Sequence, residues 1–188
     1  MRINEMFYSL QGEGYYTGTP AVFVRFAGCN LKCDFCDTDF QSYIEMAEDQ
    51  IVKQVSEFPT RHIVLTGGEP TMQVTSSFVR LLHEAGFFVQ IETNGTLKLP
   101  PDCHIDWITC SPKYKEVKLS HIDELKVVYQ GQDMTQYDGI EASQYRLQPC
   151  DSGNIEKNKE NLQQTINYIL QHPKWKLSLQ THKMINVR

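Results

Sequence analysis

Three cysteines lie close together in the first part of the chain, at Cys29, Cys33 and Cys36, with the spacing C-x3-C-x2-C. Each thiolate can bind one iron of a cubane 4Fe–4S cluster, so a loop with three cysteines leaves the fourth iron without a protein ligand. Proteins that only carry electrons generally supply four cysteines. The spacing therefore favours a cluster whose open iron binds a small chelating molecule.

Two other interpretations of this cysteine loop stay open. One is a structural zinc site, which would need a fourth ligand such as Cys103, Cys110 or Cys150. The other is a set of three buried thiols that bind no metal. No second pair of cysteines or histidines has the spacing that structural zinc sites use, so the cluster is the preferred interpretation.

The hydrophobic pattern predicts the elements that must position these cysteines. Short runs rich in β-formers predict strands, and apolar residues at helical spacing predict helices. The predicted strands cover residues 21–26, 62–66, 87–93, 106–110, 124–129, 145–148 and 176–181, and the predicted helices cover residues 46–58, 76–85 and 156–171.

This alternation predicts an α/β fold with a parallel sheet and right-handed crossovers. A complete eightfold barrel needs about 200 to 250 residues, which is more than a chain of 188 residues readily supplies. We therefore predict one domain over residues 1–188, with a partial (β/α)6 TIM-barrel-like core. We expect reduced helical content and a short extra C-terminal helix and strand.

Polar clusters follow the predicted strands at their carboxyl ends. The cysteine loop follows the first strand, and the Gly-Gly-Glu-Pro of residues 67–70 follows the second. Residues 111–113 follow the fourth strand, and residues 148–151 follow the sixth. Because the carboxyl ends of parallel strands face one mouth, these clusters should converge there and form a site.

Bulk composition narrows the classes of partner. Hydrophobic residues make up 40% of the chain and charged residues 22%, and the net charge is −5 without a basic block. Neither nucleic acid nor a membrane surface is expected as the main partner of such a chain. The N-terminus lacks a secretory pattern and no run of about 20 apolar residues occurs, so we expect a cytoplasmic protein.

A C-x3-C-x2-C loop in a short α/β chain resembles the radical S-adenosylmethionine (SAM) superfamily, and residues 66–70 resemble its glycine-rich segment. The resemblance implies that SAM binds the open iron through its methionine amino and carboxylate groups. It also implies that backbone groups of the glycine-rich segment bind the amino group, with Glu69 placed to assist.

Four further motifs resemble the 7-carboxy-7-deazaguanine synthase family: residues 7–14 (FYSLQGEG), Arg25, residues 36–38 and residues 179–183 (LQTHK). The resemblance covers nearly the whole chain. It implies a lyase of queuosine and deazapurine biosynthesis, which contracts the ring of 6-carboxy-5,6,7,8-tetrahydropterin to 7-carboxy-7-deazaguanine and releases ammonia. It further implies Mg2+, a homodimer, and an electron donor such as flavodoxin.

The family's binding residues carry over by motif. Arg25 suits a carboxylate, and Gln11 and Glu13 suit the amide edge of a pterin. The substrate set is Leu10, Gln11, Gly12, Glu13, Arg25, Thr66 and Arg188, where family members often end in proline. The SAM set is Phe35, Cys36, Asp37, Gly68, Ser111, Pro112, Lys113, Gln148, Pro149, Cys150 and Asp151, and Thr38 is the Mg2+ ligand.

For several of these residues a structural role is an alternative to a role in binding. Arg25 can instead pair with a core carboxylate, Thr38 can be a turn hydroxyl, and His182 fits a substrate donor as well as a structural histidine. No catalytic side chain is assigned beyond the ligands of the cluster and substrate. The alternative functions are an activating enzyme that forms a glycyl radical on a partner protein, and a non-enzymatic iron–sulfur or zinc module.

Overall fold

A computed structural model of the chain describes residues 1–34, 36 and 42–188. Within these residues, nine strands form one sheet in the order β3-β1-β2-β4-β5-β6-β7-β8-β9. The strands are β1 (Arg2–Leu10), β2 (Pro20–Phe26), β3 (Ile44–Glu45), β4 (His62–Gly67), β5 (Phe88–Thr93), β6 (Trp107–Cys110), β7 (Glu124–Tyr129), β8 (Gln144–Pro149) and β9 (Lys176–Leu177). The helices are α1 (Glu48–Val55), α2 (Ser76–Glu84), α3 (Ile155–Gln171) and α4 (Thr181–Met184), with 3-10 turns η1 (Pro70–Met72) and η2 (Thr135–Tyr137).

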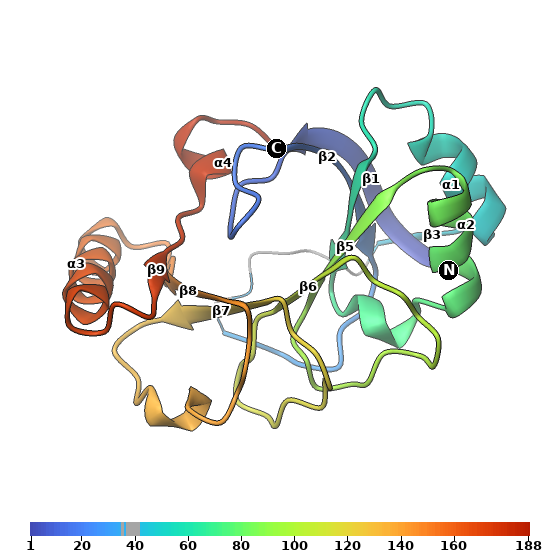
Figure 1. Cartoon of the computed structure of the whole chain (residues 1–188). Coiled ribbons are helices and arrows are strands. Elements are labelled where there is room, and N and C mark those ends of the chain that lie inside the picture. The colour runs from blue at the N-terminus through green and yellow to red at the C-terminus, as the bar shows by residue number, and fades with distance from the viewer. Residues whose placement is uncertain (35, 37–41) are drawn as a thin grey trace.

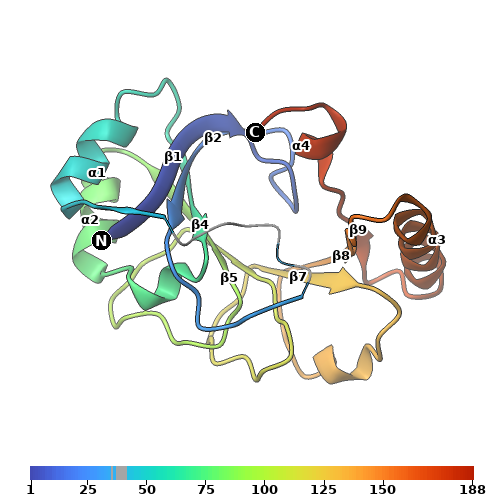
Figure 2. The ribbon, with the colours of Figure 1, turned by 180° about the vertical axis from the view of Figure 1, so that it is seen from behind.

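The sheet curves into an incomplete ring, with β1 and β2 at one side and β8 and β9 at the other (Figures 1 and 2). Strands β2 and β4 to β9 pair in parallel, whereas β1 pairs antiparallel with β2 and with β3. The loop after β1 and helix α4 lie in the gap between the two sides (Figure 1). The predicted open α/β architecture is therefore confirmed, and the sheet is not a closed barrel.

The predicted element map lacks strands β1 and β3 and extends the last strand too far. Strand β1 was not predicted, because a register shift between Ile3 and Glu5 interrupts the alternation by which a strand is recognised. The predicted strand at 176–181 stops at Leu177, and Thr181 instead begins α4.

Side chains alternate between the two faces of the sheet, and the faces differ in polarity. On β7, Leu125 and Val127 point outward into an apolar cluster that includes Trp175. The residues that alternate with them, Glu124 and Lys126, point into the ring, where Glu124 accepts from the loop after β1 and Lys126 lines a cavity. The outer face supplies the two larger apolar clusters. The inner face carries polar side chains together with a small apolar cluster of Ala21, Phe23 and Val64.

Helices cover only part of the outer face. The larger apolar cluster joins β2, β4 and β5 to α1 and α2, where Phe26 packs edge-on against Phe78 at a centroid distance of 6.5 Å. In the described residues, loops alone connect β5 to β6 and β6 to β7, as the reduced helical content predicted. None of the helices described is long and apolar enough to cross a membrane.

The loop after β1 closes the amino-terminal end of the strands. Tyr16 lies 4.9 Å from His62, 5.6 Å from Phe88 and 5.0 Å from Trp107 between ring centroids. These three residues are the first of β4, β5 and β6. The backbone N–H of Tyr15 donates to the Glu124 carboxylate at 3.0 Å, at the start of β7. The ring is therefore closed at this end, and a ligand must enter elsewhere.

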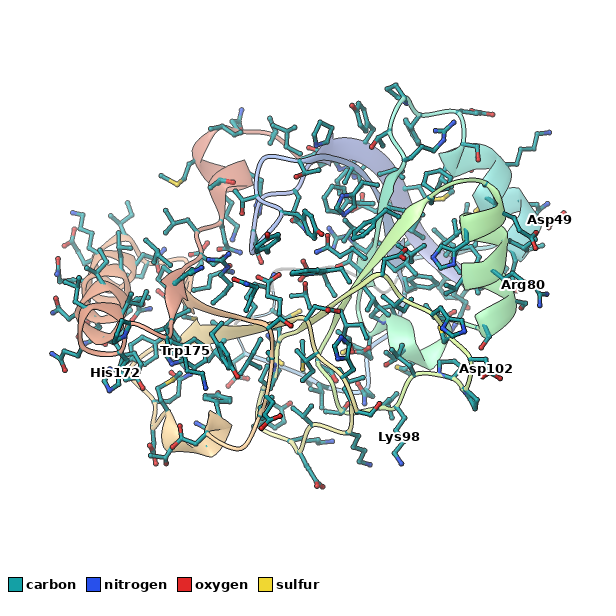
Figure 3. The ribbon with its side chains drawn as sticks, in the orientation of Figure 1. Asp49, Arg80, Lys98, Asp102, His172 and Trp175 are labelled. Carbon is teal, nitrogen blue, oxygen red and sulfur yellow. The ribbon has the colours of Figure 1, made fainter. Side chains whose placement is uncertain are left out.

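Replacing Phe78 by alanine should destabilise the fold. Its side chain is fully buried between α2 and the sheet, so the Phe78→Ala cavity should lower the free energy of unfolding by about 3–5 kcal/mol. The matched control is Arg80→Ala on the same helix, since Arg80 points outward and makes only an exposed ion pair with Glu84 (Figure 3). Urea denaturation followed by circular dichroism measures both. A Phe78→Ala loss no larger than that of Arg80→Ala would contradict the assigned core.

Candidate active site

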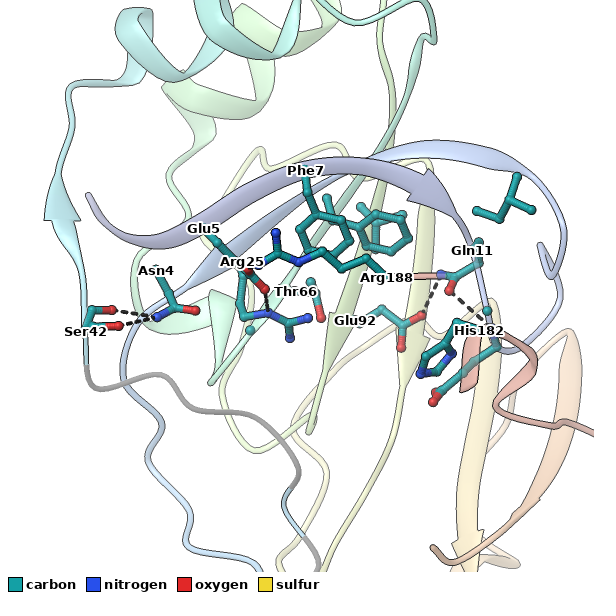
Figure 4. A pocket seen from close by; sticks show the side chains of 16 residues that line it. Asn4, Glu5, Phe7, Gln11, Arg25, Ser42, Thr66, Glu92, His182 and Arg188 are labelled. Atoms are coloured by element: carbon teal, nitrogen blue, oxygen red, sulfur yellow. Dashed lines mark hydrogen bonds and ion pairs between the residues drawn. The ribbon is translucent and has the colours of Figure 1, made fainter. Parts of the chain in front are cut away.

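Two cavities lie side by side on the inner face of the ring. The large cavity has a volume of about 740 Å3 (Figure 4). The cysteine cavity has a volume of about 230 Å3 and is lined by Cys29, Cys33 and Cys36. Both are lined by Glu13, Thr66, Gly67 and Glu92, so these four residues form a shared boundary.

The cysteine cavity collects most of the residues predicted to bind SAM. Besides the cysteines it is lined by Gly68, Ser111, Lys113, Gln148, Pro149, Cys150 and Asp151. Pro112 is buried and does not line it. Phe35, Asp37 and Thr38 lie outside the described residues, so their predicted roles stay predictions.

The cysteine loop is fixed against the turn that follows β4 by backbone contacts. The N–H of Gly68 donates to the carbonyl oxygen of Phe26 at 2.9 Å, and the N–H of Glu69 donates to that of Gly28 at 2.9 Å. A Cβ at Gly68 would stand 1.9 Å from the carbonyl oxygen of Gly28. Only glycine fits at this position, because any side chain would push the cysteine loop away from the turn.

Two further contacts hold the loop from the other side of the mouth. The side chain of Asn30 donates to Thr96 at 2.8 Å and accepts from Asn94 at 3.0 Å. The hydroxyl of Tyr114 donates to the carbonyl oxygen of Lys32 at 3.0 Å. The loop is thereby bound to segments that follow three different strands.

Glu69 does not reach either cavity, which corrects the expectation that its side chain assists a ligand. Its carboxylate is fully buried and accepts from the N–H of Thr71 at 3.0 Å, the Thr93 hydroxyl at 2.6 Å and the N–H of Asn94 at 2.7 Å. It therefore joins the turn after β4 to the end of β5.

The three cysteines line one cavity, as the ligands of a 4Fe–4S cluster would. Within the described residues, no three histidine, cysteine, aspartate or glutamate side chains converge on one metal position. A cubane binds each thiolate at a different iron, so its cysteines need only line a common cavity. Burial raises the pKa of the Cys29 and Cys33 thiols, which means that metal binding must displace their protons.

The other cysteines differ in position. Cys110 is fully buried against Gly95, and burial raises its pKa to about 12. Cys103 lies outside both cavities, among the side chains around the core of α1 and α2. Cys150 alone shares the cysteine cavity, at the end of β8. Of the remote ligands considered for zinc, two are therefore misplaced.

All seven residues predicted to bind substrate line the large cavity: Leu10, Gln11, Gly12, Glu13, Arg25, Thr66 and Arg188. Arg25 donates through Nε to Glu5 at 2.8 Å, and Arg188 also pairs with Glu5 (Figure 4). The alternative to substrate binding by Arg25 was an ion pair with a carboxylate of the protein. The structure shows this ion pair, and it also places Arg25 in the wall of the large cavity. No other hydrogen bond of the Arg25 guanidinium occurs within the residues described.

The C-terminal segment covers the large cavity next to the loop after β1. Thr181 donates to the carbonyl oxygen of Gly12 through both its N–H and its hydroxyl, each at 2.9 Å. A Cβ at Gly12 would stand 2.1 Å from Nδ1 of His182. His182 therefore faces the cavity across a position where only glycine fits (Figure 4).

At the shared boundary, the predicted substrate residue Glu13 belongs to a group of charges whose other members, Lys126 and Glu92, were not predicted as site residues. The ammonium of Lys126 lies 2.7 Å from Glu13 and 2.7 Å from Glu92. Burial alone would raise the pKa of Glu13, but Lys126 lowers it to about 2. Burial raises the pKa of Glu92, which Lys126 only partly offsets. The sequence does contain an indication of this group. Charged residues stand at alternate positions of otherwise apolar strands, and such residues mark the polar inner face of the sheet.

The end of β8 is held in place by polar contacts. Gln148 accepts from the Ser178 hydroxyl at 2.8 Å, and Ser178 accepts from the N–H of Gly14 at 3.0 Å. Asp151 pairs with Lys183 at 2.7 Å, and this contact with other hydrogen bonds lowers its pKa to about 2. Carboxylate and amide groups are therefore fixed on one side of the cysteine cavity.

Known proteins are similar to this chain in both sequence and fold. The profile of the radical SAM superfamily matches residues 23–125, which is more than half of the chain. The chain is 52% identical to the 7-carboxy-7-deazaguanine synthase of Bacteroides thetaiotaomicron, over 100% of this chain and 98% of that protein. It is 38% identical to the enzyme of the same name from Bradyrhizobium diazoefficiens, over 99% of this chain and 98% of that protein.

Two solved structures are also similar. QueE from Escherichia coli superposes with a TM-score of 0.81 at 28% sequence identity, over 96% of this chain and 94% of that chain. Streptococcus suis SuiB, solved with its precursor peptide SuiA, gives a TM-score of 0.54 at 13% identity over 82% of this chain and 47% of that chain. The second likeness shows a shared fold alone.

Replacing Gly68 by alanine should displace the cysteine loop while the sheet stays folded. After anaerobic reconstitution with iron and sulfide, the Gly68→Ala protein should hold less than about one iron per chain, compared with about four for the wild type. Gly139→Ala is the control, because no atom of the described residues beyond its two chain neighbours lies within 4 Å of the added Cβ, and the backbone is not left-handed there. Iron analysis and visible absorbance measure the result. Normal iron content in Gly68→Ala would refute the assigned contact with Gly28.

Proposed function

The chain belongs to the radical SAM superfamily and, within it, to the 7-carboxy-7-deazaguanine synthase family, and from this premise we propose its reaction. It contracts the ring of 6-carboxy-5,6,7,8-tetrahydropterin to 7-carboxy-7-deazaguanine and releases ammonia. The observation that carries this proposal is the pair of adjoining cavities, one lined by the cysteine triad and the other by a partly exposed arginine. A radical formed in one cavity can therefore reach a carboxylated substrate in the other.

On the cofactor side, Cys29, Cys33 and Cys36 would hold the 4Fe–4S cluster. With SAM bound, the cluster would supply radical chemistry that removes a hydrogen atom from the substrate. The backbone at Gly67 and Gly68 approaches the methionine end without a side chain in the way. The remaining cofactor contacts come from two segments, Ser111–Lys113 and Gln148–Asp151, whose hydroxyl, amide and carboxylate groups suit a nucleoside. Their location in one cavity supports this assignment.

On the substrate side, Arg25 binds the pterin carboxylate with the guanidinium nitrogens that face the cavity, while Glu5 fixes its orientation through Nε. Gln11 and Glu13 read the amide and amino edge of the ring. A cavity of about 740 Å3 lies within the range for small-molecule sites. The C-terminal segment covers it, which suits closure around a small molecule better than access by the protein substrate of an activating enzyme.

Other features are proposed on the resemblance or on the sequence composition. Thr38 coordinates Mg2+, a hard ion that accepts oxygen ligands and orients the substrate carboxylate. The protein is a cytoplasmic homodimer, takes its electron from a donor such as flavodoxin, and forms one domain over residues 1–188. The single sheet that runs through the chain supports the last of these proposals.

The reaction can be tested directly on the reconstituted protein. With SAM, a reductant, Mg2+ and 6-carboxy-5,6,7,8-tetrahydropterin, mass spectrometry should detect 7-carboxy-7-deazaguanine and ammonia should be released. Omission of Mg2+ should lower the rate. If 5′-deoxyadenosine forms and the pterin is left unchanged, the synthase proposal fails. A radical that then appears on an added partner protein would identify an activating enzyme.

Loss of the Arg25 side chain should impair pterin use specifically. Arg25→Ala should lower kcat/KM for the pterin by about 10- to 100-fold, because a charge-assisted contact to the carboxylate is lost. Cleavage of SAM in the absence of pterin should stay largely intact, and Arg25→Lys should recover part of the loss. Arg80→Ala, on the outer face, serves as the control. Equal loss of both activities in Arg25→Ala would refute substrate binding by this residue.

A further inference from the structure

Lys126 occupies an unusual place among the residues of the site. It projects from the middle of β7, is 4% exposed, and lines the cysteine cavity. Its ammonium lies 2.7 Å from Oε2 of Glu13 and 2.7 Å from Oε2 of Glu92. Those two carboxylates are the charged residues that line both cavities. One buried cation therefore serves two partly buried carboxylates at the boundary between the two cavities.

The second oxygen of each carboxylate has a different partner. Oε1 of Glu13 accepts from the Gln180 amide at 2.9 Å, and Oε1 of Glu92 accepts from the Gln11 amide at 3.1 Å. Glu13 and Gln11 belong to the loop after β1, whereas Gln180 precedes α4. Lys126 is thus the centre of a chain of contacts that joins this loop and the C-terminal segment to the inner face of the sheet.

We propose that Lys126 is a positioning residue, which keeps Glu13 and Glu92 ionised and holds the loop after β1 over the substrate. This inference rests on the proposed function, because it concerns recognition of the pterin in the same site. Two carboxylates without a cation between them would repel each other in a buried place. One would take up a proton or the loop would move outward, and in either case acceptors for the amino edge of the pterin would be lost.

The pH dependence of this site follows from the charges around Lys126, Glu13 and Glu92. The other ionisable groups that face it are Glu124 from the start of β7 and Lys113 from the loop after β6. Without Lys126, burial and mutual repulsion raise the pKa of both Glu13 and Glu92. Lys113 lies farther along the cavity wall, and burial lowers its pKa. Binding that needs ionised acceptors is then lost as the pH falls, and it is lost at a higher pH than in the wild type.

Lys126→Met tests the proposal, since methionine keeps the length and removes the charge. In the reconstituted protein it should weaken pterin binding by at least about tenfold and move the acid limb of kcat/KM to higher pH. Hydrogen exchange of residues 11–18 should become faster. Lys126→Arg should recover part of the affinity, because the charge is kept. Lys176→Met on β9 is the control, since Lys176 is exposed and lines neither the large cavity nor the cysteine cavity.

A double-mutant cycle separates positioning from general packing. In a Glu13→Gln protein the repulsion is already removed, so Lys126→Met should cost less there than in the wild type. If Lys126→Met does not fold, Lys126→Gln takes its place in the same measurements. Unchanged pterin affinity and pH profile, or additive losses in the cycle, would overturn the proposal. If the wild type itself makes no 7-carboxy-7-deazaguanine, the proposed function fails instead, so the two failures are distinguishable.

Discussion

The contact between Gly68 and the carbonyl oxygen of Gly28 is the constraint on which the site depends. Two backbones meet there without a side chain, and two hydrogen bonds from the turn after β4 hold the start of the cysteine loop. The same turn is joined to the end of β5 by the buried Glu69 carboxylate. Because Gly67 lines both cavities, the position of this turn fixes where cofactor and substrate adjoin.

The two faces of the sheet divide stability from chemistry. The outer face buries Val, Ile, Leu and Phe side chains against α1, α2 and α3, which drives folding. The inner face carries Glu92, Lys126 and Arg25, whose burial costs free energy unless each charge is paired. The observed ion pairs meet that requirement, and they leave the same groups oriented toward the cavities. Because successive side chains of a strand point to opposite faces, one sheet can have an apolar outer face and a charged inner face.

Much of this architecture could be predicted from local pattern, and the reasons for the failures are physical. Strands β4 and β5 are apolar runs ended by glycine or by Asn-Gly, so both their type and their polar ends were predictable. Strand β1 pairs antiparallel across a register shift, and such pairing leaves no clear period in the sequence. Lys126 lies within an apolar strand, where a single residue does not reveal which partners the fold brings from Glu13 and Glu92. To predict such a long-range ion pair, one must know the order of the strands in the sheet, and the local sequence pattern does not contain that order.

The closure of the large cavity has a consequence for the order in which the molecule is assembled. Thr181 donates to Gly12 across a sequence separation of 169 residues, and Gln180 donates to Glu13 across 167. During synthesis these contacts cannot form until the segment after β9 has left the ribosome. Closure of a loop this long is entropically costly, so it follows the formation of local structure. The cysteine loop and its supporting turn are therefore synthesised long before the segment that covers the large cavity.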